Sequence, residues 1–142
     1  MSPPPQSALK RTLSAALAGL LFAGPAAALP QGGQVVSGKA AISQVNPSTI
    51  QIQQFTANVV INWKGFSVGA NELVRFLQPG AMSVAVNTVI GGSASAILGQ
   101  ITANGRIVLN NPAGITFGPG SLVNVGGLIA TTLNMKDIDL AS

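Results

Sequence analysis

The sequence predicts an all-β domain built from many short strands. After residue 28 no segment keeps the 3.6-residue apolar period of a helix, whereas apolar and polar residues alternate in many short stretches. Gly, Pro and Asn, which favour chain reversals, separate these stretches. Charged residues make up only 7% of the chain and aromatic residues 4%, so the alternation rests on small and aliphatic side chains.

The alternating stretches define the expected strands in chain order. They cover residues 50–53, 57–64, 82–86, 106–110, 115–117 and 123–125. Residues 70–77 suit either a single helical turn or a strand, and the alternation of Val74 and Phe76 favours the strand.

Residues that tolerate positive φ or preset φ mark the expected reversals between the strands. These are Gly32-Gly33, Asn46-Pro47, Gly69, Pro79-Gly80, Gly91-Gly92, Asn104-Gly105, Pro112, Gly118-Pro119-Gly120 and Gly126-Gly127. Asn104-Gly105 is the strongest hairpin signal by residue type. It equally fits a corner between two sides of a coil.

Strands and turns of this kind suit a β-sandwich, a β-barrel or a β-solenoid. Two features favour the solenoid: charged and aromatic residues are scarce outside the expected core faces, and small residues dominate the corners, where coils must stack closely. At 20–45 residues per coil, residues 29–142 would form about three to five coils. The chain shows no strict repeat, so composition alone leaves the three architectures open.

Residues 1–28 have the three regions of a cleavable signal peptide. Lys10-Arg11 precede an apolar run at 13–22, the run ends before Gly24-Pro25, and Ala26-Ala27-Ala28 supplies a small-x-small site. The run is about half of the roughly 20 apolar residues that a membrane span requires. We therefore expect a signal helix that uses the general export machinery.

Signal peptidase is expected to cut between Ala28 and Leu29, which leaves residues 29–142 as one domain. This part keeps five basic and three acidic residues, a formal net charge of +2. Because the cations are scattered, nucleic acid is not an expected partner. The chain has no Cys, so core packing and hydrogen bonds must hold the exported domain together.

The residue inventory argues against an enzyme. The chain has no His, Cys or Tyr, and thus lacks the commonest general base, the commonest metal ligand and the thiol nucleophile. Glycosidic chemistry needs paired carboxylates across a cleft. Glu72 stands alone, while Asp137 and Asp139 lie near the end of the sequence. We predict no catalytic residues, no metal and no cofactor.

Several blocks of the sequence carry a family resemblance in a common order. They are residues 29–33, 61–69, 86–99, 103–118 and 123–132. Together they resemble the N-terminal secretion domain of the filamentous-haemagglutinin type, also called the haemagglutination activity domain. This domain belongs to the exported protein of bacterial two-partner secretion systems.

The family hallmark Asn-Pro-Asn-Gly-aliphatic corresponds here to Asn111-Pro112-Ala113-Gly114-Ile115. Pro112 and Gly114 keep the backbone constraint of the turn, whereas Ala113 removes the side-chain amide of the third position. Asn46-Pro47 is a weaker match to a second hallmark that some family members carry earlier in the chain.

The resemblance assigns transporter recognition to Asn111, Pro112, Gly114 and Ile115. It assigns structural roles to Asn62, Trp63, Phe66, Gly69, Asn104, Gly105, Phe117 and Gly118. Independently of the family, a single Trp on an alternating stretch is expected to pack inward rather than to form a sugar platform.

The resemblance implies a partial right-handed parallel β-helix over residues 29–142, preceded by the signal helix. It implies export through the periplasm of a Gram-negative bacterium. An outer-membrane β-barrel transporter with POTRA domains then recognises the domain, which acts as a nucleus for β-helix folding. The product is secreted or held at the cell surface.

The same resemblance implies an incomplete secretion domain, with a passenger absent from this sequence that would contact the host-cell surface. The alternative is a stand-alone carbohydrate- or cell-surface-binding β-helix module. The scarcity of aromatic residues argues against this alternative.

Overall fold

The computed structural model describes residues 28–133, which form twelve strands and no helix. The expected signal helix falls on residues 1–27, outside the described part. The strands are β1 Gln34–Ser37, β2 Ala40–Asn46, β3 Thr49–Gln54, β4 Asn58–Trp63, β5 Leu73–Leu77, β6 Val84–Val89, β7 Ser95–Ile97, β8 Gln100–Ala103, β9 Arg106–Asn110, β10 Ile115–Phe117, β11 Leu122–Asn124 and β12 Gly127–Thr131.

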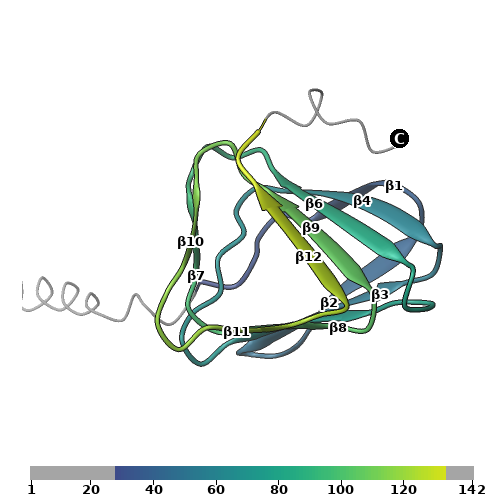
Figure 1. Ribbon diagram of the computed structural model, residues 1–142, viewed down its shortest axis with the longest axis horizontal. Helices are drawn as coiled ribbons and strands as arrows, with labels where there is room; N and C mark the ends of the chain where they lie inside the picture. Colours follow the sequence, from purple (N-terminus) through teal and green to yellow (C-terminus); the bar gives the residue numbers. More distant parts are fainter. Residues whose placement is uncertain (1–27, 134–142) are drawn as a thin grey trace, which may run out of the picture.

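The strands wind into a β-helix of about four coils with three sides, as Figure 1 shows. One side has the strand order β1-β4-β6-β9-β12, the second has β11-β8-β5-β3-β2, and the third has β10-β7. From β3 onward every strand pair is parallel. The β-helix architecture expected from the sequence is therefore confirmed.

The coils differ in length, which explains why the sequence shows no strict repeat. The register pairs Thr49 with Leu73, Leu73 with Gln100, and Gln100 with Leu122. Successive coils on this side therefore take 24, 27 and 22 residues. Asn104-Gly105 forms a corner between β8 and β9, not a hairpin.

Two antiparallel strands close the N-terminal end of the coil stack. β1 pairs antiparallel with β4, and β2 pairs antiparallel with β3. Asn46 turns the chain from β2 into β3, where its Oδ1 accepts the Ser48 N–H at 2.9 Å. The cap occupies the edge of the first coil, which would otherwise offer unpaired backbone groups to another chain.

Inward side chains stack in columns from coil to coil. One column is Ile50, Val74, Ile101 and Val123, which occupy paired positions on β3, β5, β8 and β11. The first three are buried, whereas Val123 on the last described coil is half-buried. Each coil thus buries its apolar face against its neighbours, as solenoids require.

Amide side chains bridge the coils at the corner between the two long sides; Gln54 and Gln78 are buried, whereas Asn104 is exposed. Gln54 Nε2 donates to the Val84 carbonyl at 3.1 Å, and Gln78 Nε2 donates to Gln54 Oε1 at 3.2 Å. Gln78 Oε1 in turn accepts the Gly105 N–H at 2.8 Å. Asn104 Nδ2 donates to the Gln78 carbonyl at 2.7 Å. These bonds satisfy backbone groups that the turning chain leaves without ladder partners.

The expected start of β6 is wrong. The alternation predicted a strand from Met82, but β6 begins at Val84, and Met82 is 74% exposed in the turn that precedes it. Ser83 explains the later start, because its hydroxyl accepts the Gly80 N–H at 3.1 Å and its N–H donates to the Gly80 carbonyl at 3.1 Å. A side-chain-to-backbone bond of this kind favours a turn over a strand.

Substitution of Gly99 tests how closely the corners of neighbouring coils pack. A Cβ at this position would overlap the backbone carbonyl oxygens of Gly69 and Glu72. We predict that Gly99→Ala lowers the free energy of unfolding by about 1–3 kcal/mol, as overpacking does. Gly80→Ala is the control, because a Cβ there has no atom within 4 Å. Equal urea midpoints for the two variants would contradict the close stacking.

Candidate functional site

The side chain of Asn111 lies inside the turn that carries the family hallmark. It is 1% exposed, and its Nδ2 donates to the Ser93 carbonyl and to Ser95 Oγ, both at 2.9 Å. Its Oδ1 accepts the Ala113 N–H at 2.9 Å. Asn111 therefore holds the turn closed and ties it to the preceding coil.

Backbone hydrogen bonds fix the same turn on both sides. The Gly114 N–H donates to the Asn111 carbonyl, and the Gly114 carbonyl accepts the Ser95 N–H, both at 2.9 Å. The Asn111 N–H donates to the Thr131 carbonyl of the following coil at 2.9 Å. Gly114 has a φ of +122°, a conformation that side chains rarely adopt.

The outer surface of the turn belongs to Pro112 and Ala113, both exposed. Gly114 and Ile115 are half-buried, and Ile115 packs against the core. A shallow pocket of about 370 Å³ opens beside the turn. It is lined by Thr88, Val89, Ile90, Gly92, Asn110, Asn111, Pro112 and Ala113. Of the four residues predicted for recognition, Pro112 is thus the one whose side chain is exposed.

Asn110 has no hydrogen-bond partner although it is 1% exposed. Both its Oδ1 and its Nδ2 are buried and unpaired. Asn110 and Asn111 are adjacent, and an Asn side chain at such a position can close a turn through bonds to the backbone. Asn111 does so, whereas Asn110 ends β9 and lies across from Thr88 and Thr131 of the neighbouring strands.

Trp63 packs in the core, as its place on an alternating stretch predicted. It is 1% exposed, and its ring packs edge-on against Phe66 with the ring centroids 5.5 Å apart. Its Nε1 donates to Asn87 Oδ1 at 2.9 Å. Asn87 also donates to the Val108 carbonyl at 3.3 Å. The alternation misses this role: it sets Met82, Val84 and Val86 on the apolar face and Asn87 on the polar face, whereas Asn87 is fully buried.

The remaining residues of the family blocks lie at several separate places. Gly69 donates its N–H to the Glu72 carboxylate at 2.7 Å, and Gly118 donates to the Ile97 carbonyl at 2.8 Å. Asn62 is half-buried on β4. Phe117 is 40% exposed, because it stacks above Ile97 on a coil with no further described coil above it.

The described residues contain one carboxylate, Glu72, and no group of three or more potential metal ligands. Asp137 and Asp139 lie outside the described part. No helix within residues 28–133 is long and apolar enough to cross a membrane. The two residues of the expected cleavage site begin the described part: Ala28 donates its N–H to Glu72 Oε2 at 3.3 Å, and Leu29 packs against the core.

A larger groove of about 750 Å³ runs over the side formed by β4, β6, β9 and β12. Val60, Val86, Val108 and Ile129 occupy corresponding positions on these four strands and line it. The groove is mainly apolar, with Arg106 among the lining residues.

Comparison with known families gives the deciding observation. The family model of the TPS secretion domain matches residues 26–141. The chain belongs to the two-partner secretion (TPS) domain family.

Curated and solved relatives agree with this assignment. The TPS domain is 46% identical over 110 residues to a heme/hemopexin-binding protein of Haemophilus influenzae strain Rd, and 40% identical over 109 residues to another from the same species. The matches cover 78% and 77% of this chain but only 12% of each relative.

Among solved structures, the HMW1 secretion domain of Haemophilus influenzae superposes with a TM-score of 0.71 at 36% identity. The match covers 78% of this chain and 28% of that one.

Removing the Asn111 amide should loosen the turn of the TPS domain. We predict that Asn111→Ala lowers the free energy of unfolding by about 2–3 kcal/mol, because buried Ser95 Oγ and a backbone carbonyl lose their donor. Ala113→Ser, at the exposed position of the same turn, should change it by less than about 0.5 kcal/mol. Urea unfolding followed by Trp63 fluorescence measures both. A neutral Asn111→Ala would contradict the internal role.

Removing the unpaired amide of Asn110 should raise the free energy of unfolding, whereas removing the amide of Asn111 lowers it. We predict that Asn110→Val raises the free energy of unfolding by about 1–3 kcal/mol, because a buried polar group without partners is lost. Asn87→Val is the matched control and should destabilise, because it breaks the bond to Trp63 Nε1. Loss of stability in both variants would show that Asn110 has a partner in solution.

Proposed function

We propose that this TPS domain directs its protein out of a Gram-negative cell by presenting the exposed face of the turn at residues 111–115 to an outer-membrane transporter. The observation that carries the proposal is the family match over residues 26–141. A TPS secretion domain is the exported partner of a two-partner system, and the other partner is the outer-membrane transporter. Secretion targeting is therefore the function the fold supports best.

The division of the hallmark turn supports a specific recognition surface. The side chain of Asn111 is engaged inside the fold, since it bonds to Ser93 and Ser95 of the preceding coil and to Ala113 within the turn. Pro112 and Ala113 face solvent beside a pocket. Rigidly held, exposed loop positions commonly carry binding. We assign recognition to these two positions, and to Gly114 and Ile115 the task of holding them in place.

The proposed route has two steps. Signal peptidase removes residues 1–28 after general export, and the domain then passes through the periplasm to the POTRA domains and the β-barrel of the transporter. A chain without Cys cannot form disulfides that would block threading. Few charges also lower the cost of passing through a pore.

The last described coil supports a role in nucleating folding. Inward residues Val123, Val125 and Leu128 are only partly covered there, whereas the equivalent Ile101 and Ile107 of the preceding coil are buried. A following coil would cover them and find a ready strand edge for pairing. We propose that folding of the exported protein propagates from this domain toward its C-terminal end.

Other activities are less well supported. Binding named for the relatives belongs to proteins of which this chain spans 12%, and the chain has no His, Cys or Tyr to ligate haem iron. A stand-alone sugar-binding module would need an exposed aromatic platform, and Trp63 is buried. We propose that the domain is not an enzyme and that surface binding resides in a passenger.

Secretion with and without the cognate transporter tests the proposal. The protein should reach the medium only when the transporter is present, and should otherwise stay in the periplasm as a processed chain. We predict that Ala113→Lys reduces secretion at least about tenfold, equivalent to about 1.4 kcal/mol of lost recognition. Ala81→Lys adds the same charge at an exposed position of another corner and should be secreted normally.

The comparison requires that both lysine variants unfold at the same temperature as the unsubstituted protein, so that a difference in secretion does not reflect a loss of stability. Equal secretion with and without the transporter would contradict the proposed function. Equal secretion of the two lysine variants would contradict only the proposed surface.

A further inference from the structure

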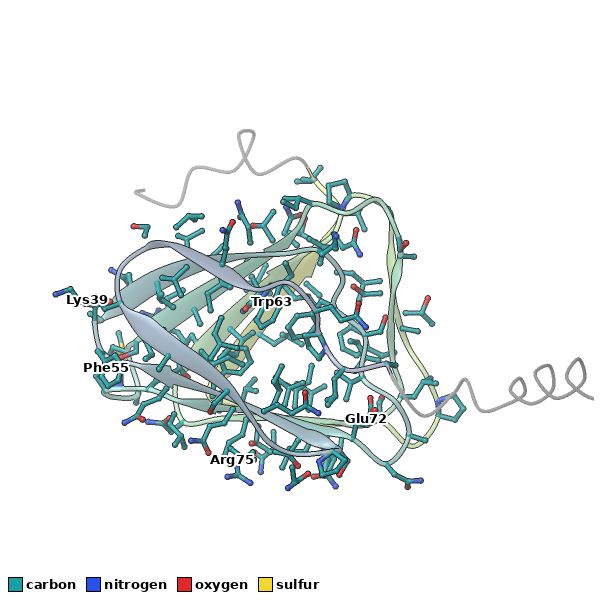
Figure 2. All side chains as sticks on the ribbon, turned by 180° about the vertical axis from the view of Figure 1, so that it is seen from behind. Lys39, Phe55, Trp63, Glu72 and Arg75 are labelled. Carbon is teal, nitrogen blue, oxygen red and sulfur yellow. The ribbon has the colours of Figure 1, made fainter. Side chains whose placement is uncertain are left out.

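Glu72 is a buried carboxylate at the corner between the third side and β5. It is 5% exposed, and it is the one acidic residue in the part of the chain that the structure describes. Figure 2 shows it within the outline of the coils, whereas Arg75 projects outward from the sheet. Burial of a carboxylate is costly unless an opposite charge or several donors compensate it.

Two backbone N–H groups donate to this carboxylate. Gly69 donates to Oε1 at 2.7 Å, and Ala28 donates to Oε2 at 3.3 Å. Arg75, at helical i, i+3 spacing in the sequence, instead donates its Nη1 to Gln51 Oε1 at 3.0 Å. The Gly69 bond belongs to the corner itself, whereas the Ala28 bond comes from 44 residues away.

Cleavage after Ala28 would remove the second donor and create a cation one residue further along the chain. Hydrolysis breaks the Ala28–Leu29 peptide bond; the water hydroxyl goes to the Ala28 carbonyl carbon, and the Leu29 amine takes up a proton. Ala28 leaves with its N–H. An α-amino group has a pKa of about 7.7–8.0, so the new terminus is mainly an ammonium at neutral pH.

The residues that follow the cut hold this terminus near Glu72. Leu29 packs against the core, and Pro30 is buried. The Gln31 N–H donates to the Gly65 carbonyl at 2.8 Å, and the Gln31 carbonyl accepts the Lys64 N–H at 2.9 Å. The new ammonium thus lies one residue from the Ala28 nitrogen, on a segment already anchored to the first coil.

We propose that the α-ammonium released by signal-peptide removal forms a buried ion pair with the Glu72 carboxylate. Processing then completes the first coil: the uncut chain offers Glu72 Oε2 the neutral N–H of Ala28, and the cut chain offers the carboxylate a full positive charge. Charge-assisted hydrogen bonds are stronger than neutral ones. The fold would gain its final stability only after the leader is gone. The inference rests on the proposed cleavage.

The test uses processed protein recovered from the periplasm of cells that lack the transporter. Folded protein is treated with an amine-acylating reagent, and the terminal amine is compared with exposed Lys39 and Lys64 in the same molecule. We expect the folded terminal amine to react about tenfold more slowly for each pKa unit by which pairing stabilises the ammonium. Glu72→Gln should restore fast acylation, because it keeps the shape and removes the charge.

A second comparison tests the ion pair even if the Glu72→Gln variant fails to fold. A chain with Glu72 intact and a short uncleaved Gly-Ser extension before Leu29 should unfold at a lower urea concentration than the processed chain. Where Glu72→Gln does fold, the extension should have no effect in that background, as a coupled pair requires. An extension effect of equal size in both backgrounds would overturn the ion pair, as would a Glu72→Gln amine that reacts no faster.

Mass spectrometry of the processed chain separates the two proposals. A terminus other than Leu29 would refute the proposed cleavage. The ion pair would then be tested on a chain released at Leu29 by a tag protease, and slow, Glu72-dependent acylation would still support it.

Discussion

The structure depends on side-chain amides that hold successive coils together where the chain turns. Strand ladders supply hydrogen bonds along the sides of a β-helix, but at each corner the backbone leaves the ladder. Gln54, Gln78 and Asn104 supply the missing partners at one corner, and Asn111 supplies them at the next. An amide has two N–H donors and an acceptor oxygen on separate atoms, so one side chain can bridge groups on two coils, which an apolar side chain cannot do.

This constraint gives the family hallmark a different meaning. Asn111 is an internal member of the corner network, and the surface of the turn is left to Pro112 and Ala113. Substitution of the third hallmark position by Ala is tolerated because the turn takes its closing bonds from Asn111 and Gly114. A transporter that binds this turn would therefore recognise a surface whose conformation the fold determines. Glu72 likewise depends on a distant partner, because its Oε2 accepts a hydrogen bond from the start of the described chain.

Features with a local signal could be predicted from the sequence. Alternation placed most strands and the inward-facing Trp63, and Asn-Gly marked the corner at 104–105. Features set by contacts between coils could not. Asn110 and Asn111 are identical neighbours, yet one bridges coils and the other has no partner. Likewise the buried Asn87 and the antiparallel cap depend on pairing across the stack, which alternation along one strand does not encode.

Native-state hydrogen exchange of the folded domain tests the corner network most directly. Gln78→Leu keeps the bulk of the side chain and removes its bonds to Gln54 and to the Gly105 N–H. If the amides hold the coils together, exchange should accelerate at Gly105 and across the β5–β6 and β8–β9 corners. Amides of the β7–β10 side, such as Gly118, should keep their protection. Unchanged exchange at Gly105, or an equal loss of protection on all three sides, would contradict the account.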